Sequence, residues 1–123
     1  MKLRLDGTEK QRNYISAVED DHIRVHDQKF TRSLIISTNT LHDWAVSDAN
    51  EMDALLLQPL LDLKPEIIVI GTGPTHIFPS HSSLRLLIEA GVGYELMTTT
   101  AACRTYNVLL AEDREVVAGL ILP

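Results

Sequence analysis

The chain has 123 residues, a formal net charge of -6 at pH 7 and a hydrophobic fraction of 45%. This length suits one domain (1–123) whose core needs neither disulfides nor a structural metal. The acidic balance excludes a general nucleic-acid binder and a binder of acidic membranes. The lone Cys103 excludes an intramolecular disulfide and fits a reducing compartment.

Residues up to about Arg12 form a polar, flexible lead-in by composition. They lack the apolar region of a signal peptide, and no stretch reaches the roughly 18 apolar residues of a transmembrane helix. We therefore expect a cytoplasmic protein without membrane insertion.

The first part of the chain predicts an antiparallel meander. Three roughly alternating runs, 13–18, 22–26 and 29–36, are separated by the polar pairs 20–21 and 27–28. Alternation places one side chain in two on a single face of the sheet. The expected inward residues are Ile23, Val25, Phe30 and Leu34.

An extended piece over 41–46 precedes a predicted helix. Ser47 or Asp48 is the expected N-cap, because a short polar side chain accepts a hydrogen bond from the free N–H groups of the first turn. Pro59 is expected to end or bend this helix. The apolar residues that recur at helical spacing are Met52, Leu55 and Leu56.

A wholly apolar run, Ile67 to Ile70, leads into the corner Gly71-Thr72-Gly73. An apolar run without alternation is typical of a strand that is buried on both faces. After a proline-rich loop, a helix is predicted from Ser80 or Ser82, closed by Gly91 at the C′ position. Its expected buried stripe is Leu84, Leu87 and Ile88.

The order then continues with a strand over 93–97, a helix from 101 to about 111 and a strand over 116–121. A strand–helix–strand step favours a parallel crossover. The sequence therefore predicts an α/β fold: a single layered domain with a mixed central sheet, a parallel strand–helix–strand core and an N-terminal antiparallel meander.

Parallel strands end at the same edge of a sheet, so the loop 71–76 and the helix start 98–101 are predicted neighbours. Free N–H groups at a helix start favour an anion. The candidate binding residues of this crevice are Gly71, Thr72, Gly73, His76, Thr98, Thr99, Thr100 and Arg104. The structural alternative also stands: a tight turn at the glycines, threonines that serve as N-caps, and an Arg104 that is solvated or paired with Glu95 or Glu112.

Other chemistry finds less support. A dinucleotide fingerprint requires a glycine where His76 stands, so no cofactor is predicted. His22 and His26 could share a strand face, but they lack a third metal ligand. G-x-S-x-G is absent, and a lone helical cysteine such as Cys103 is more often a small buried hydrophobe than a nucleophile. No catalytic residue and no metal ligand is assigned.

The second half nevertheless carries a recognisable pattern. Ile68 to Gly73, Glu95 to Met97, Thr100 to Asn107 and then Arg114 with Val116 to Leu120 resemble one family of unknown function. This is the family that contains mitochondrial complex I assembly factor 3 and the adipogenesis-associated domain protein. The chain departs from the commoner family pattern at Thr98, where an acidic residue often stands, and at Asp113, where glycine often stands.

The resemblance implies a single layered α/β domain with no established activity or cofactor. The mitochondrial members of the family act in respiratory-complex assembly through protein contacts. We therefore expect a non-catalytic interaction or assembly-type domain with an unknown protein partner. The alternative is an enzyme or a small-molecule domain that binds an anion in the crevice between Gly71–Gly73 and Thr98–Arg104.

Overall fold

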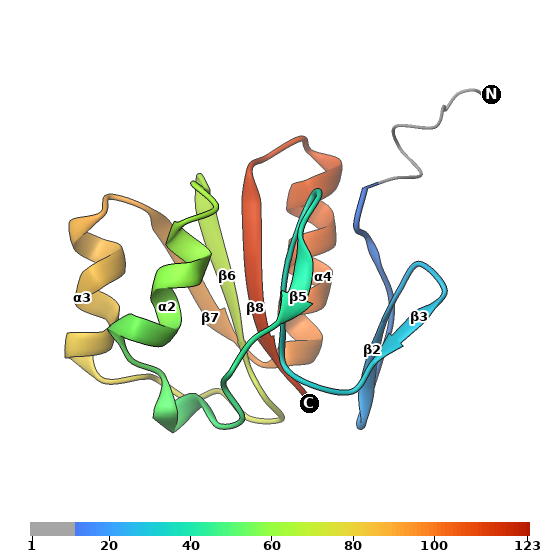
Figure 1. Cartoon of the computed structure of the whole chain (residues 1–123), viewed down its shortest axis with the longest axis horizontal. Helices are drawn as coiled ribbons and strands as arrows, with labels where there is room; N and C mark the ends of the chain where they lie inside the picture. The colour runs from blue at the N-terminus through green and yellow to red at the C-terminus, as the bar shows by residue number, and fades with distance from the viewer. Residues whose placement is uncertain (1–11) are drawn as a thin grey trace.

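Two β-sheets organise the computed structural model, which describes residues 12–123 (Figure 1). A three-stranded antiparallel sheet contains β1 (Ile15–Glu19), β2 (His22–Val25) and β3 (Gln28–Phe30). A five-stranded sheet has the strand order β5-β4-β8-β6-β7. The predicted flexible lead-in lies outside the described residues, apart from Arg12.

The five-stranded sheet is mixed. β4 (Leu34–Ser37) pairs antiparallel with β5 (Leu41–Asp43) and β8 (Val116–Ile121), while β6 (Ile67–Thr72) runs parallel to β8 and to β7 (Gly93–Met97). β6 and β8 are buried along almost their whole length, as strands covered on both faces must be. The predicted α/β class, mixed central sheet and parallel core are confirmed.

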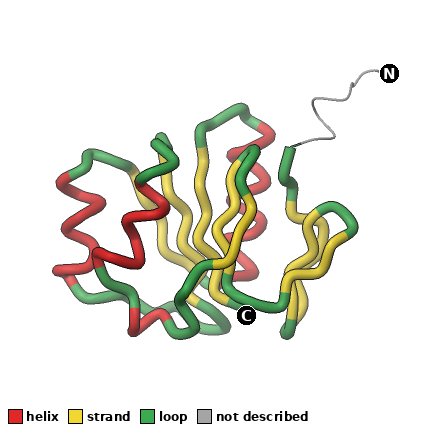
Figure 2. The backbone as a smooth tube through the Cα atoms, in the orientation of Figure 1, coloured by secondary structure: helices red, strands yellow, loops and turns green. Residues whose placement is uncertain are grey.

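Helices cover both faces of this sheet (Figure 2). One face carries the short 3₁₀ turn η1 (Ala49–Glu51), α2 (Ala54–Leu61) and α3 (His81–Glu89); the other carries α4 (Thr99–Ala111) and the three-stranded sheet. Alternate side chains of β6 therefore enter two separate apolar cores. Val69 packs in the core with α4, and Ile68 and Ile70 pack in the core with α2 and α3.

The predicted run 29–36 is not one strand of the meander. It divides at Ser33, whose carbonyl oxygen accepts a hydrogen bond from Trp44 N at 2.9 Å, and its second part is β4 of the central sheet. Leu34 to Ile36 are all buried, so this segment has the unbroken apolar pattern of a strand covered on both faces.

The predicted helix after residue 46 is also two elements. Asp48 caps η1 in a capping box with Glu51, and Asp53 then caps α2 through a 2.9 Å hydrogen bond from Leu56 N. The buried residues of α2 are Leu57 and Leu60. Leu55, one of the apolar residues noted at helical spacing, is 80% exposed.

Pro59 lies inside α2 without ending it. In α3 the N-cap is Ser80, and Leu84 and Leu87 are buried as predicted. Ile88 is 59% exposed, against prediction, because it lies on the outer side of the helix. Gly91 follows the α3 C-cap with a φ of 72°, which is the predicted C′ role.

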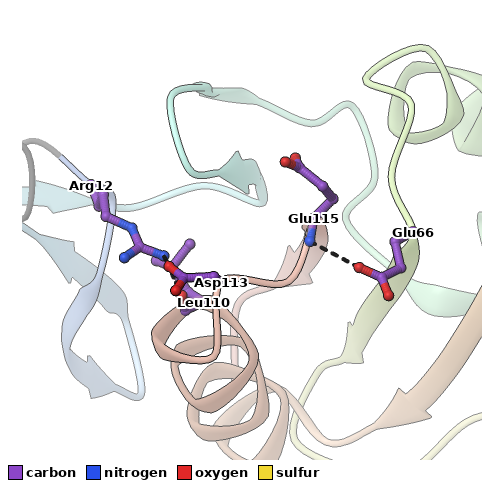
Figure 3. Close-up of polar contacts among 5 residues, drawn as sticks. All are labelled: Arg12, Glu66, Leu110, Asp113 and Glu115. Carbon is purple, nitrogen blue, oxygen red and sulfur yellow. Dashed lines mark hydrogen bonds and ion pairs between the residues drawn. The ribbon is translucent and has the colours of Figure 1, made fainter.

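The connection from α4 to β8 is held by charged side chains on both sides (Figure 3). Arg12 donates to the carbonyl oxygen of Leu110 at the end of α4 and pairs with Asp113 at 3.1 Å. A cation at this place complements the negative end of the helix dipole. On the other side, Glu66 accepts from Glu115 N at 3.2 Å, which joins the starts of β6 and β8.

Asn13 connects three parts of the fold. Its Nδ2 donates to the carbonyl oxygens of Ser37 and Thr40 at 3.0 and 3.1 Å, and its own carbonyl oxygen accepts from Tyr106 Oη at 2.8 Å. Both amide hydrogens are thus used, so Oδ1 is the acceptor for His26 Nε2 at 2.9 Å and His26 donates.

Asn13→Ala should lower the free energy of unfolding by about 2 kcal/mol, because it leaves the Ser37 and Thr40 carbonyl oxygens without their amide donor. Urea denaturation measures the loss. Asn39→Ala, at an exposed position between the two residues that Asn13 binds, is the control and should leave the midpoint nearly unchanged. Equal midpoints for both variants would contradict this role of Asn13.

Candidate functional site

The glycine corner of β6 lies directly beneath the start of α4. A Cβ atom at Gly71 would lie 2.8 Å from Thr99 Oγ1, 2.9 Å from Thr99 Cα and 3.2 Å from Ala102 Cβ. Only glycine allows the helix to approach the strand this closely. The next glycine, Gly73, has a φ of 100°, so the chain turns away from the strand in a conformation that favours glycine.

Thr99 fastens this corner from inside the protein. Its side chain is fully buried; its hydroxyl donates to the carbonyl oxygen of Ile121 and accepts from Gly73 N at 2.9 Å. The Thr99 backbone N–H in turn donates to the carbonyl oxygen of Gly73, also at 2.9 Å. One residue thus joins the first turn of α4 to the ends of β6 and β8.

Thr72 holds the loop that follows. Its hydroxyl donates to the carbonyl oxygen of Thr75 at 2.6 Å, with the carbonyl oxygen of Met97 at 3.2 Å, and it accepts from Ile77 N at 3.2 Å. The Thr72 side chain is buried. The loop 73–77 is therefore attached to the ends of both β6 and β7.

The predicted proximity of the loop 71–76 and the helix start 98–101 is confirmed by these hydrogen bonds. Thr98 is the N-cap of α4 and accepts from Ala101 N at 3.4 Å. Arg104 is exposed and makes no ion pair with any residue from 12 to 123. His76 is exposed at the outer side of the loop, with its ring centroid 4.5 Å from that of Phe78.

Anion binding at this corner stays a prediction. If it holds, inorganic phosphate should shift the backbone amide resonances of Thr98 to Arg104, because Arg104 is free to add its charge to the helix start. Arg104→Ala should abolish the shifts, and Arg85→Ala, an equal loss of charge at an exposed position of α3, should not. Unchanged amide resonances at saturating phosphate would exclude the anion site.

Cys103 lies on the inner side of α4 and is 2% exposed. Burial raises the pKa of its thiol from about 9.0 to about 12, against a smaller opposite effect of the Arg104 charge. The thiolate is the reactive form, so a thiol with this pKa is neither a nucleophile nor a redox centre near neutral pH. The structural interpretation of Cys103 therefore accounts for its position.

Cys103 should resist alkylation by iodoacetamide in the native protein at pH 8 and react only at the rate of unfolding. Because of the raised pKa, the Cys103 thiol keeps its proton to a higher pH in the folded state than in the unfolded state. Its contribution to the free energy of unfolding is therefore complete below pH 9 and is lost as pH rises toward 12. Urea midpoints across that interval should fall less in Cys103→Ala than in the unaltered chain. Rapid native alkylation would contradict the buried position.

Two grooves were not predicted. One follows the carboxyl edge of the sheet past Trp44 and Ile121, with a volume of about 390 Å³. The other, about 340 Å³, lies beside β7 and is lined by Phe78, Pro79, His81, Leu84, Tyr94 and Leu96. The feature of the sequence that could have indicated the groove beside β7 is Phe78. It is an aromatic residue that precedes a proline in a loop, where helix packing cannot bury it.

Residues 12–123 contain no group of three histidine, cysteine or acidic side chains that could hold a metal ion. The family comparison supplies the remaining information. A model of proteins of unknown function, DUF498/DUF598, matches residues 15–121, which is almost all of the described chain. The chain belongs to the DUF498/DUF598 family. The resemblance drawn from the sequence is thereby confirmed.

The relatives of this DUF498/DUF598 chain include two kinds of named protein. It is 30% identical over 95 residues to a "13 kDa major membrane protein" of Francisella tularensis, covering 76% of this chain and 77% of that protein. It is 26% identical over 115 residues to human NADH dehydrogenase [ubiquinone] 1 alpha subcomplex assembly factor 3, covering 92% of this chain. The chain spans 62% of the length of that human relative.

Solved structures of similar proteins have the same fold. A Bordetella parapertussis protein is 34% identical, with a TM-score of 0.86 over 91% of this chain and 97% of that one. A Bordetella pertussis protein described as an Mth938-like domain is 29% identical, with a TM-score of 0.81 over 98% of this chain and 92% of that one. The DUF498/DUF598 chain therefore has the Mth938-like architecture.

Within the described part of this DUF498/DUF598 chain, every helix is too short or too polar to cross a bilayer. The printed names of its relatives refer to a membrane protein and to the assembly of a respiratory complex. The cytoplasmic location stays a prediction.

Proposed function

We propose that this chain is a non-catalytic, assembly-type domain that binds another polypeptide. The observation that carries this proposal is its kinship with complex I assembly factor 3, which extends over 92% of the chain for the human relative and 98% for the Xenopus tropicalis relative. A similarity of this extent covers the whole fold and is not confined to one motif.

The surface supports a binding role. Four large apolar side chains are more than half exposed: Leu55, Phe78, Ile88 and Val108. Leu55 and Ile88 come from α2 and α3, which pack side by side over one face of the sheet (Figure 1). Apolar side chains exposed on two neighbouring helices support a surface that a partner covers, whereas Val108 lies on α4, over the other face of the sheet.

The polar side chains of the glycine corner support a structural role rather than a catalytic one. The hydroxyls of Thr72 and Thr99 form hydrogen bonds with backbone groups of the same corner. Cys103 is buried, with a raised pKa. These three side chains therefore present no nucleophile to a substrate.

The test is reciprocal co-purification from the native host. A tagged copy expressed at its natural level should recover one partner in a fixed ratio, and the tagged partner should recover this chain. A chain that elutes alone at the volume of a monomer, with no partner in either direction, would overturn the proposal. The corner variant Arg104→Ala separates the anion-binding alternative, because it should leave the recovery of a protein partner unchanged.

A further inference from the structure

β7 forms one outer edge of the five-stranded sheet. It pairs with β6 alone, in an unbroken register from Ile67↔Gly93 to Gly71↔Met97. Because the backbone groups of a strand point alternately to its two sides, about half of those in β7 face away from β6. Among residues 12–123, no side chain or loop bonds to this outer side between Gly93 and Leu96.

This edge has only one of the usual protections. Proteins block free edges with proline, charged side chains (lysine above all), a bulge or a very short strand. β7 has five residues, a regular register, and neither proline nor lysine. Its one charged residue is Glu95, which is exposed. The opposite edge strand, β5, has only three residues.

An apolar groove accompanies the edge on the α3 side. Tyr94 and Leu96 of β7 line it together with Leu84 of α3 and the loop residues Phe78 and Pro79. Phe78 is 70% exposed. A strand added to β7 would direct every second side chain to this side of the sheet. The groove would therefore receive the alternate side chains of such a strand.

We propose that the β7 edge and this groove bind an extended segment of a partner protein, which pairs with Gly93–Met97 as an added strand. The segment carries apolar side chains toward the groove and a lysine or arginine opposite Glu95 on the other face of the sheet. Main-chain hydrogen bonds provide the affinity and the side-chain sites provide the selectivity. The proposal rests on the assembly-type function proposed above and specifies its surface.

Charge decides between a partner and a second copy of this chain. Glu95 is the middle residue of β7, so symmetric antiparallel pairing of two copies would place their Glu95 carboxylates opposite each other. Like charges at directly opposed positions destabilise a strand pair. Each copy also carries a net charge of -6. A basic segment from a partner avoids the repulsion between the two Glu95 carboxylates, and the net negative charge of this chain attracts it.

The probes are short synthetic peptides that alternate valine with lysine or valine with glutamate. We expect the lysine peptide to bind saturably, measured by fluorescence anisotropy, and to protect the outward amides of Gly93–Met97 from hydrogen exchange. A lysine peptide with alternate backbone N-methyl groups cannot pair along that edge and should not bind. The glutamate peptide should bind more weakly, by up to about fivefold for one opposed charge pair.

The matched variants are Glu95→Lys and Glu89→Lys, both at exposed positions. Glu95→Lys should reverse the preference between the two peptides, whereas Glu89→Lys makes the same change of charge at the end of α3, outside β7, and should preserve it. Phe78→Ala should weaken binding of the lysine peptide. Thermal unfolding establishes that the variants remain folded.

Three results would overturn the proposal: no saturable binding of the lysine peptide, binding that is indifferent to N-methylation, or a sedimenting dimer whose β7 amides are protected without peptide. The last would assign the edge to a second copy. Failure of the surface is distinct from failure of the function. A partner recovered equally well by Glu95→Lys and Phe78→Ala would retain the assembly-type function and exclude this edge, whereas absence of any partner would exclude the function itself.

Discussion

Gly71→Ala should lower the free energy of unfolding by about 3 kcal/mol. The added Cβ would lie 2.9 Å from the backbone Cα of Thr99, and a backbone atom at a helix start cannot move aside as a flexible side chain can. Relief requires α4 to shift away from β6. That shift would stretch the hydrogen bonds between Thr99 and Gly73 and open the apolar core beneath the helix.

Gly93→Ala is the control for this prediction. Gly93 lies on the neighbouring strand, and a Cβ there would meet its nearest atoms, Glu66 O and Ile67 Cγ1, at ordinary distances of 3.8 and 3.9 Å. Urea denaturation of the two variants should therefore show a large loss for Gly71→Ala and a small change for Gly93→Ala. Equal stability of the two variants would mean that the approach of α4 to β6 is not as close as the structure has it.

Thr99→Val should cost about 3 kcal/mol, although the two side chains have nearly the same shape. The substitution leaves Gly73 N and the Ile121 carbonyl oxygen buried without the Thr99 hydroxyl, and each unsatisfied buried group costs about 1–3 kcal/mol. No solvent reaches the site to replace the lost partner, because Thr99 is fully buried.

Thr99→Ser separates the hydroxyl from the methyl group. Serine keeps both hydrogen bonds and loses one buried methyl, which costs about 1 kcal/mol. In thermal or urea unfolding, the unaltered chain should be the most stable, Thr99→Ser should be less stable, and Thr99→Val should be the least stable. The reverse order of the two variants would show that packing of the methyl group, and not hydrogen bonding, holds the corner.

The second half of the fold could be predicted because its local signals agree with its tertiary environment. The bounds of β7 and β8 coincide with the predicted segments 93–97 and 116–121, and Gly91 ends α3 as predicted. Apolar runs and helix caps carry this information within a few neighbouring residues. The sheet edge shared by the loop 71–76 and the start of α4 then follows from parallel pairing alone.

The first half departs from prediction where two interpretations are equally good locally. Asp48 and Asp53 are both competent N-caps, and which of them begins the helix depends on how Leu57 and Leu60 meet the sheet. Likewise, a turn at Ser33 sends β4 to the central sheet, although residues 29–36 read as one strand. Tertiary packing decides both cases.

The surface around β7 could not be predicted for a different reason. A strand sequence does not state its place in the sheet, so the outer position of β7 comes only from the strand order. The apolar side chains Tyr94 and Leu96 look like ordinary core residues in the sequence. Their access to a groove depends on the loop with Phe78 and Pro79, which no periodic pattern describes.

The central place of β8 has a consequence for the order of folding. β8 separates β4 from β6, yet it is translated after both of them, and Leu34 pairs with Leu120 across most of the chain. A growing chain that has reached Asp113 holds two unjoined parts of one sheet, each with an exposed edge. Pairings between such distant segments form slowly and leave those edges open to wrong contacts. Insertion of the 116–121 strand is therefore the event that completes the sheet.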